Sequence, residues 1–312
     1  MLLTALTVFI IFFATLAGQS LDPLLTYPMY ALWLAAGIFA LLKRGQIGEP
    51  GLLALLGIMA SVAINGIDDY FGYRRVLTIL GYMGTYYFLQ AQRPNLDCGL
   101  AIAGTLMSLL SVCGVVLGNP NVVSAIILLT IPAALSAWPD HWMRRWYALA
   151  AGAVGLAALG SRGAWLAAGV ALVVYSRRWW LLALAPPLAG LSVTIRPSTI
   201  AQRVHVWSQA LPDVSLWGRG FGTALYPIID GSRMEFHAHC VPLTIAVEAG
   251  LPGLVTLIAM LWRLVPRLGR GWQGATLAGL LAWSLVDEVI WFWGPGLAAV
   301  YLIAEVMRDA DR

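Results

Sequence analysis

Apolar residues in this chain form long runs, and the charged residues fall in short clusters between those runs. A helix of about 17–25 mainly apolar residues can cross the hydrocarbon core of a bilayer. The pattern therefore predicts twelve membrane-spanning helices, most of them joined by short loops. They are expected near residues 2–18, 24–42, 50–66, 75–91, 98–118, 122–138, 146–160, 163–176, 179–195, 241–262, 272–290 and 296–307.

Composition indicates the same class of protein. Of the 312 residues, 60% are apolar and only 11% are charged, whereas soluble domains contain about 25% charged residues. This composition excludes an ordinary soluble enzyme and a disordered chain. The net charge of +4 is too small to indicate nucleic-acid binding. We therefore predict a single all-α transmembrane domain over residues 1–312.

The distribution of basic residues predicts the orientation, because cytoplasmic loops of membrane proteins are enriched in lysine and arginine. With both termini in the cytoplasm, twelve of the 19 basic residues fall on the cytoplasmic side. The other seven face outward: Arg74, Arg75, Arg162, Arg196, Arg203, Arg219 and Arg233. These outward arginines depart from the general bias, so we expect a function for them.

The longest polar segment is the predicted outer loop over residues 196–240. Long loops in compact proteins are usually functional or disordered, and the many apolar residues of this one argue against disorder. Val204, Trp207 and Leu211 recur at helical spacing. They predict an amphipathic helix over residues 200–211 that lies on the membrane surface. The glycines of the sequence WGRGFG, at residues 217–222, predict a tight turn.

Arg162, in the sequence SRGAWL, stands at the outer start of the eighth predicted span. One interpretation is an interfacial arginine that reaches the lipid headgroups, and the other is a guanidinium that faces the helix bundle and holds an anion. Two parallel N–H donors of arginine match phosphate oxygens, which lysine cannot do. Ser161 and Gly163 are small, and we expect them to let a large substrate approach Arg162.

Two histidines, His237 and His239, stand in the sequence HAHC just before the tenth predicted span. They can be metal ligands, an unimportant surface pair, or a general base and hydrogen-bond partner. Zinc needs three or four ligands, and the three widely spaced cysteines do not complete such a set. Near neutral pH a histidine can take a proton from a hydroxyl. The outward arginines would stabilise the charge on a phosphate leaving group.

Other acidic residues are also candidates. Glu248 lies within the tenth predicted span, where a carboxylate is a candidate functional group. It can serve a substrate or bond to a neighbouring helix, and the sequence favours neither role. Two acidic pairs, at 68–69 and 287–288, are interpreted as solvated helix-end charges and surface ion pairs.

Three motifs occur in order on the outer side of the predicted membrane. The first is Arg-x-x-x-Leu, present at residues 162–166. The second is an arginine followed by a tryptophan and a glycine-rich turn, present at residues 203–222. The third is His239 with Cys240, nine further residues and then Gly-x-x-Gly at residues 250–253. Together these motifs resemble those of the O-antigen ligase and polymerase superfamily of bacterial membrane glycosyltransferases, in which an asparagine, serine or glutamine usually stands in place of Cys240.

The resemblance implies a C-type glycosyltransferase-like bundle that works without a metal or a nucleotide sugar. Such enzymes move a glycan from undecaprenyl diphosphate to an acceptor hydroxyl at the periplasmic face of the bacterial inner membrane. By matched position, Arg162 and Arg203 would hold the diphosphate, and His239 would orient or deprotonate the acceptor. Further candidates for substrate binding are Arg219, Arg233, His237 and Glu248.

The motifs are of the ligase type and favour glycan transfer to lipid A–core in lipopolysaccharide biosynthesis. A polymerase of the same superfamily is one alternative, and a transporter or flippase of lipid-linked glycans is another. Transporters often have repeated halves and broken helices at the midplane, and this chain has no internal repeat. The expected partners are the undecaprenyl-diphosphate-linked glycan, an acceptor glycolipid or glycan, and the lipid bilayer, with no nucleic acid and no cofactor.

Overall fold

The computed structural model describes residues 62, 64–65, 70–92, 95–115, 119–138, 140–178, 197–227, 229, 234–235, 238–268, 271–288 and 293–309. Its helices are α4 (Tyr70–Gln92), α5 (Asp97–Val112), α6 (Pro120–Ala137), α7 (Trp142–Leu159), α8 (Arg162–Ser176), α10 (Pro197–Ala210), α11 (Val241–Leu264), α12 (Trp272–Ser284) and α13 (Trp293–Asp309). Two short 3-10 turns are η2 (Leu211–Asp213) and η3 (Val265–Arg267). The strands β1 (Tyr226–Pro227) and β2 (Met234–Glu235) form an antiparallel pair.

Helices occupy each predicted span from 75–91 onward whose residues the structure describes. Within the described part of the chain, two stretches are long and apolar enough to cross a membrane, namely α6 and the continuous stretch of α11 and η3. The helices α5 and α8 are apolar but shorter. The spans predicted at 2–18, 24–42 and 179–195, and most of the span at 50–66, lie outside the described residues. The mostly helical class is therefore confirmed, and the twelve crossings stay a prediction.

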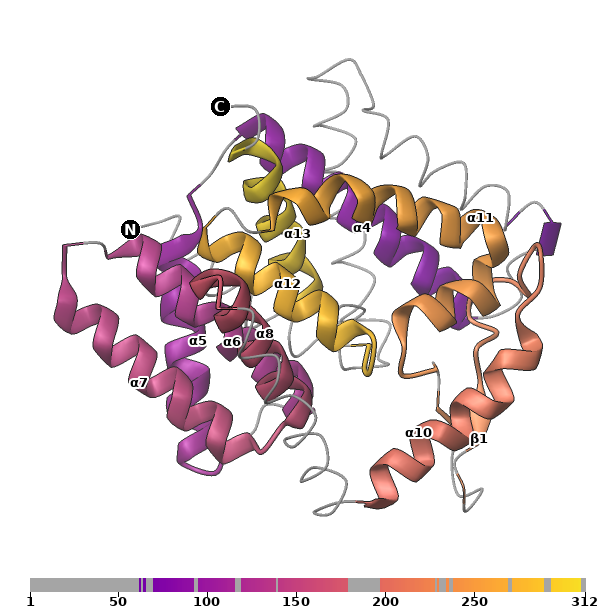
Figure 1. Ribbon diagram of the computed structural model, residues 1–312, viewed down its shortest axis with the longest axis horizontal. Helices are drawn as coiled ribbons and strands as arrows, with labels where there is room; N and C mark the ends of the chain where they lie inside the picture. Colours follow the sequence, from indigo (N-terminus) through magenta and orange to yellow (C-terminus); the bar gives the residue numbers. More distant parts are fainter. Residues whose placement is uncertain are drawn as a thin grey trace.

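The core of the bundle is built around α6. This helix packs against α5 and α7 on one side of the molecule and also contacts α8, α12 and α13 (Figure 1). Every residue from Val122 to Leu129 is buried, as expected for a helix that is hydrophobic all round. The helix α8 packs along α12, and α13 packs against α4. Asn119 caps α6, because its side-chain oxygen accepts the N–H of Asn121 at 2.9 Å.

Small residues let neighbouring helices approach closely. A Cβ added at Gly279 of α12 would lie 2.2 Å from the carbonyl oxygen of Ala167 in α8, and one at Gly163 would lie 2.0 Å from Nε1 of Trp283. Trp283 is fully buried. Gly163 was expected to leave room for a substrate, and this interpretation is wrong because the space beside it is filled by the indole. Close contacts of this kind are typical of helix interfaces in membranes.

The expected helix in the outer loop is present as α10, and it has two apolar sides. Val204 and Leu211 are exposed, whereas Trp207 is half-buried and donates its indole N–H to the carbonyl of Ala238 at 2.8 Å. The location on a membrane surface stays a prediction. Val206 and Ala210 are fully buried in a cluster that includes Tyr226 of β1. The sequence pattern identified only the side that carries Val204, Trp207 and Leu211. The buried side consists of just two apolar positions one turn apart, and its partners come from later in the chain.

The helix α11 is broken at Gly250, which has φ 63° and ψ −155°, two residues before Pro252. The turn at residues 216–222 lies against this break. Arg219 donates its backbone N–H to the carbonyl of Val247 at 2.7 Å, and Gly220 donates to that of Glu248 at 3.0 Å. The carbonyl groups that the break frees are thus satisfied by the turn, as a helix interruption in an apolar environment requires.

The tight turn predicted at residues 217–222 is confirmed, because Gly218, Gly220 and Gly222 all have positive φ. Gly218 has φ +76°, and a Cβ added there would lie 2.4 Å from the carbonyl oxygen of Glu248. We expect Gly218→Ala to lower the melting temperature of the purified protein, because both the backbone conformation and the contact with α11 resist a side chain.

A matched control separates the two causes. Gly114 has φ +80°, and a Cβ there would meet nothing within 4 Å. Gly114→Ala should therefore show only the cost of the backbone conformation, about 1–2 kcal/mol. Equal melting temperatures for the two variants would contradict the tight contact between the turn and α11.

Candidate functional site

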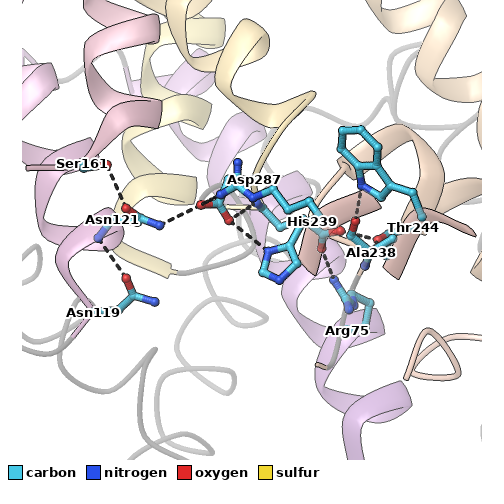
Figure 2. A network of polar contacts seen from close by, with 11 residues as sticks. Arg75, Asn119, Asn121, Ser161, Ala238, His239, Thr244 and Asp287 are labelled. Atoms are coloured by element: carbon cyan, nitrogen blue, oxygen red, sulfur yellow. Dashed lines mark hydrogen bonds and ion pairs between the residues drawn. The ribbon is translucent and has the colours of Figure 1, made fainter. Parts of the chain in front are cut away.

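The polar centre of the molecule is the carboxylate of Asp287 (Figure 2). Arg203 of α10 places Nη2 at 3.3 Å from Asp287 Oδ2, and His239 places Nδ1 at 3.7 Å from Asp287 Oδ1. Asn121 of α6 donates from Nδ2 to the same Oδ2 at 2.8 Å. Asp287 is only 6% exposed, so these partners compensate a buried negative charge. This site, called the Asp287 centre, consists of Asp287, Arg203, His239, Asn121 and Ser161.

Five segments far apart in sequence supply the Asp287 centre, and Ser161 at the start of α8 is one of them. Asp287 follows the end of α12, Arg203 is in the middle of α10, Asn121 is in the first turn of α6, and His239 precedes α11. His239 has φ 53°, a left-handed conformation that is uncommon for residues other than glycine, although histidine, asparagine and aspartate adopt it more often than most. Such conformations cost free energy and are often found at functional sites. The backbone here directs the imidazole toward Asp287.

The contacts continue from Asp287 to the start of α8. Ser161 donates its hydroxyl to Asn121 Oδ1 at 2.8 Å, and Asn121 in turn donates to Asp287 (Figure 2). Ser161 also caps α8, accepting the N–H of Ala164 at 3.4 Å. Arg162 directly follows Ser161 and is the first residue of α8, so its backbone adjoins the Asp287 centre.

The charge state of the Asp287 centre suits acid–base chemistry. Asp287 lies beyond the end of α12. Burial raises its pKa, but His239 and the positive charge of Arg203 outweigh that effect and hold the pKa below its ordinary value. An ionised carboxylate beside Nδ1 of the imidazole favours a proton on that nitrogen, which makes Nε2 the nitrogen that can accept a proton. Burial raises the pKa of the Cys240 thiol next to His239, so this thiol stays protonated and is a poor nucleophile.

A second polar cluster is buried beside the Asp287 centre. Arg75 of α4 pairs with Glu248 of α11 at 3.4 Å and with Glu288 at 3.5 Å. Glu248 also accepts the N–H of Gly222 at 3.1 Å, and Thr244 donates its hydroxyl to Glu288. Both glutamates are almost fully buried. Because Glu288 directly follows Asp287, and its N–H donates to Asp287 Oδ1 at 2.8 Å, this Arg75 cluster fixes the backbone that carries Asp287.

The structure brings some of the predicted site residues together and places others elsewhere. Arg203 and His239 come together at Asp287, and Arg162 begins the helix that Ser161 connects to them. Arg219 instead pairs with Asp213 in the half-exposed part of the loop. Two roles were considered for Glu248. Its ion pair with Arg75 of α4 supports the bond to a neighbouring helix. Two further predicted residues lie outside the described side chains, namely Arg233 and His237.

The sequence interpretation of residues 287–288 as solvated helix-end charges is wrong. Asp287 and Glu288 are 6% and 0% exposed, and each pairs with an arginine from another segment. A signal was present, since two adjacent carboxylates in the apolar sequence SLVDEVIW are costly unless they are paired. Asn121 and Ser161 had no such signal. The acidic pair at 68–69 lies outside the described residues.

The Asp287 centre provides a guanidinium, an imidazole and a buried carboxylate within a short distance of one another. These groups can hold an anion and exchange a proton with a hydroxyl. Within the described residues, no group of three or more histidine, cysteine, aspartate or glutamate side chains is arranged to bind a metal ion. Comparison with protein-family models and with curated proteins gives no match.

The pKa of Asp287 leads to a prediction about pH. A carboxylate whose pKa is lowered by folding stabilises the protein above its unfolded pKa, about 3.9. That contribution is lost as the pH falls through the lower pKa of the folded state. We therefore expect Asp287→Asn to lower the melting temperature at pH 7, and the difference from the wild type to shrink as the pH falls below about 4. A constant difference over this range would contradict the ion pair with Arg203.

Proposed function

We propose that this protein transfers a glycan from a polyprenyl diphosphate, of the undecaprenyl type, to an acceptor hydroxyl. The observation that carries the proposal is the convergence of Arg203 and His239 on the buried carboxylate of Asp287. Arg162, which the sequence motif pairs with Arg203, begins the helix that Ser161 and Asn121 connect to the same carboxylate. The chemistry of these residues agrees with the resemblance to the O-antigen ligase superfamily.

In the proposed reaction, His239 accepts the proton of the acceptor hydroxyl through Nε2. The acceptor oxygen forms a bond to the anomeric carbon of the glycan, and the bond from that carbon to the diphosphate oxygen breaks. The electron pair leaves with the diphosphate. Arg203 and Arg162 stabilise the charge on the leaving group, and Asp287 stabilises the imidazolium that forms. The proton then passes from His239 to water or to the released diphosphate.

The proposal includes a location in the bacterial inner membrane with the Asp287 centre facing the periplasm. The membrane-crossing length of α6 and α11 supports a bilayer location, and the bias of arginines toward the opposite loops supports this orientation. The contacts of the Asp287 centre gather at one end of α6 and α8. A site at one end suits a reaction at one membrane face better than passage through the membrane, which is why we prefer a transferase to a transporter.

Reconstitution of the purified protein in vesicles with an undecaprenyl-diphosphate-linked glycan tests this function. We expect a new glycosidic product and an equal amount of released undecaprenyl diphosphate. Glycan on lipid A–core would indicate a ligase, and a lengthened glycan would indicate a polymerase. Movement of the intact lipid-linked glycan between leaflets, with no diphosphate released, would instead indicate a flippase and overturn the proposal.

Metal removal gives a further expected result. Three buried carboxylates lie in and beside the Asp287 centre, and each faces an arginine: Asp287 pairs with Arg203, while Glu248 and Glu288 share Arg75. EDTA should therefore leave the transfer rate unchanged. Loss of activity with EDTA and its recovery with magnesium would show that a metal takes part in the reaction.

A further inference from the structure

A small apolar cavity lies between α5 and α7, at the end of α6 opposite the Asp287 centre. Its volume is about 240 Å³, and the residues that line it include Ile102 and Leu106 of α5, Tyr147 and Ala148 of α7, Trp138 and Arg144. A pocket that encloses a whole small molecule is usually about 300–1,000 Å³. This cavity is below that range, so it suits one part of a ligand, such as a segment of an acyl chain.

The position of the cavity relative to the bilayer follows from α6. Asn121, in the Asp287 centre, is in the first turn of this helix, and Trp138 of the cavity follows its last residue. Seventeen residues at 1.5 Å each separate the two by about 26 Å, close to the hydrocarbon thickness of about 30 Å. The cavity therefore lies near the opposite membrane face from the Asp287 centre, which the arginine distribution predicts to be cytoplasmic.

The rim of the cavity combines exposed aromatic residues with positive charge. Trp142, Trp146 and Tyr147 are all exposed on the first turns of α7, as is typical of residues at a membrane–water interface. Arg144 is exposed between them. Asp140 lies one turn earlier, and the described residues contain no ion pair between its carboxylate and Arg144. The first turn of α7 contains no acidic residue.

We propose that an anionic phospholipid of the cytoplasmic leaflet binds here, with an acyl chain in the cavity between α5 and α7 and its phosphate on Arg144. The apolar walls match the chain. The Arg144 guanidinium at the rim forms no ion pair with the described residues, and its charge matches that of the headgroup. Anionic lipids are concentrated in the cytoplasmic leaflet and attract basic residues there. This inference depends on the bilayer location of the helices and not on glycan transfer.

Lipid binding to the full-length protein in detergent, followed by native mass spectrometry, tests the inference. Phosphatidylglycerol and phosphatidylcholine with the same acyl chains serve as probes. We expect tighter binding of phosphatidylglycerol, and we expect Arg144→Gln to weaken it about fivefold, since one arginine near an anionic headgroup contributes about that factor. Inorganic phosphate at millimolar concentration should not displace the lipid, because the chain supplies much of the binding.

Arg178→Gln is the matched control, because Arg178 is also exposed and lies on the predicted cytoplasmic side, directly after α8 and Arg177. It should leave phosphatidylglycerol binding unchanged. Equal binding of the two lipids, or an equal loss in both variants, would overturn the site, because only general attraction to the membrane would remain. Displacement by inorganic phosphate alone would overturn it as well, because it would identify a simple anion site.

Discussion

His239→Asn is expected to lower the rate of glycan transfer by about 10²–10⁴-fold, the range typical of losing a general base. The imidazole is the proton acceptor in the proposed reaction, and asparagine cannot replace it at neutral pH. Asparagine tolerates the left-handed conformation that His239 adopts, with φ 53°. The variant should therefore fold normally, and the measurement is the initial rate in reconstituted vesicles at equal protein content.

His205→Asn is the control for this experiment. His205 is on the same helix as Arg203, and its ring nitrogen lies 2.6 Å from Nε2 of Gln209, one turn later in α10. It has no place in the proposed reaction, so the rate should stay within about twofold of the wild type, a difference below about 0.5 kcal/mol. A wild-type rate for His239→Asn would remove the histidine from the chemistry and leave Asp287 and Arg203 as binding groups only.

Arg75→Gln is expected to cause the largest loss of stability. The guanidinium lies between Glu248 and Glu288, and its removal leaves two buried carboxylates without a cation. Breaking a buried ion pair by removing one partner costs about 3–5 kcal/mol, which corresponds to a fall in melting temperature on the order of 10 °C. The measurement is thermal unfolding of the purified protein in detergent.

Two further variants identify the cause of that loss. Arg178→Gln changes an exposed arginine after α8 and should have a much smaller effect. The double variant Arg75→Gln with Glu248→Gln should be more stable than Arg75→Gln alone, because it removes one of the carboxylates that lost its partner. If the double variant is instead less stable than the single one, the charge of Glu248 is not what Arg75 compensates.

Part of the candidate site was accessible from the sequence. Arg203 and His239 were identified because they are polar groups in a long outer loop with a motif of defined spacing, and both reach Asp287. Arg219 carries the same charge in the same loop, yet it pairs with Asp213. The motif distinguishes Arg203 from Arg219, but their charge and their place in the loop do not, because the partner of each is decided by where α10 and the turn pack.

The buried carboxylates show the limit of the sequence most clearly. Asp287 and Glu288 are adjacent, yet one pairs with α10 and the other with α4. Whether such residues are solvated or buried depends on cations supplied by segments about 80 and 210 residues earlier in the chain. The same holds for the break in α11. Its glycine and proline are visible in the sequence, but the turn that satisfies the freed carbonyl groups is not.

The sequence by itself determined the mostly helical class, the approximate positions of the helices that the structure describes, and the loop that carries Arg203 and His239. These features are local, because hydrophobic runs, glycines and charges act over one or two turns of the chain. Only the tertiary structure decided which carboxylate joins the arginine to the histidine, and which face of α10 is buried. Those outcomes depend on contacts between remote segments. The cost of burying a charged side chain is offset only when an oppositely charged side chain from another segment is buried beside it.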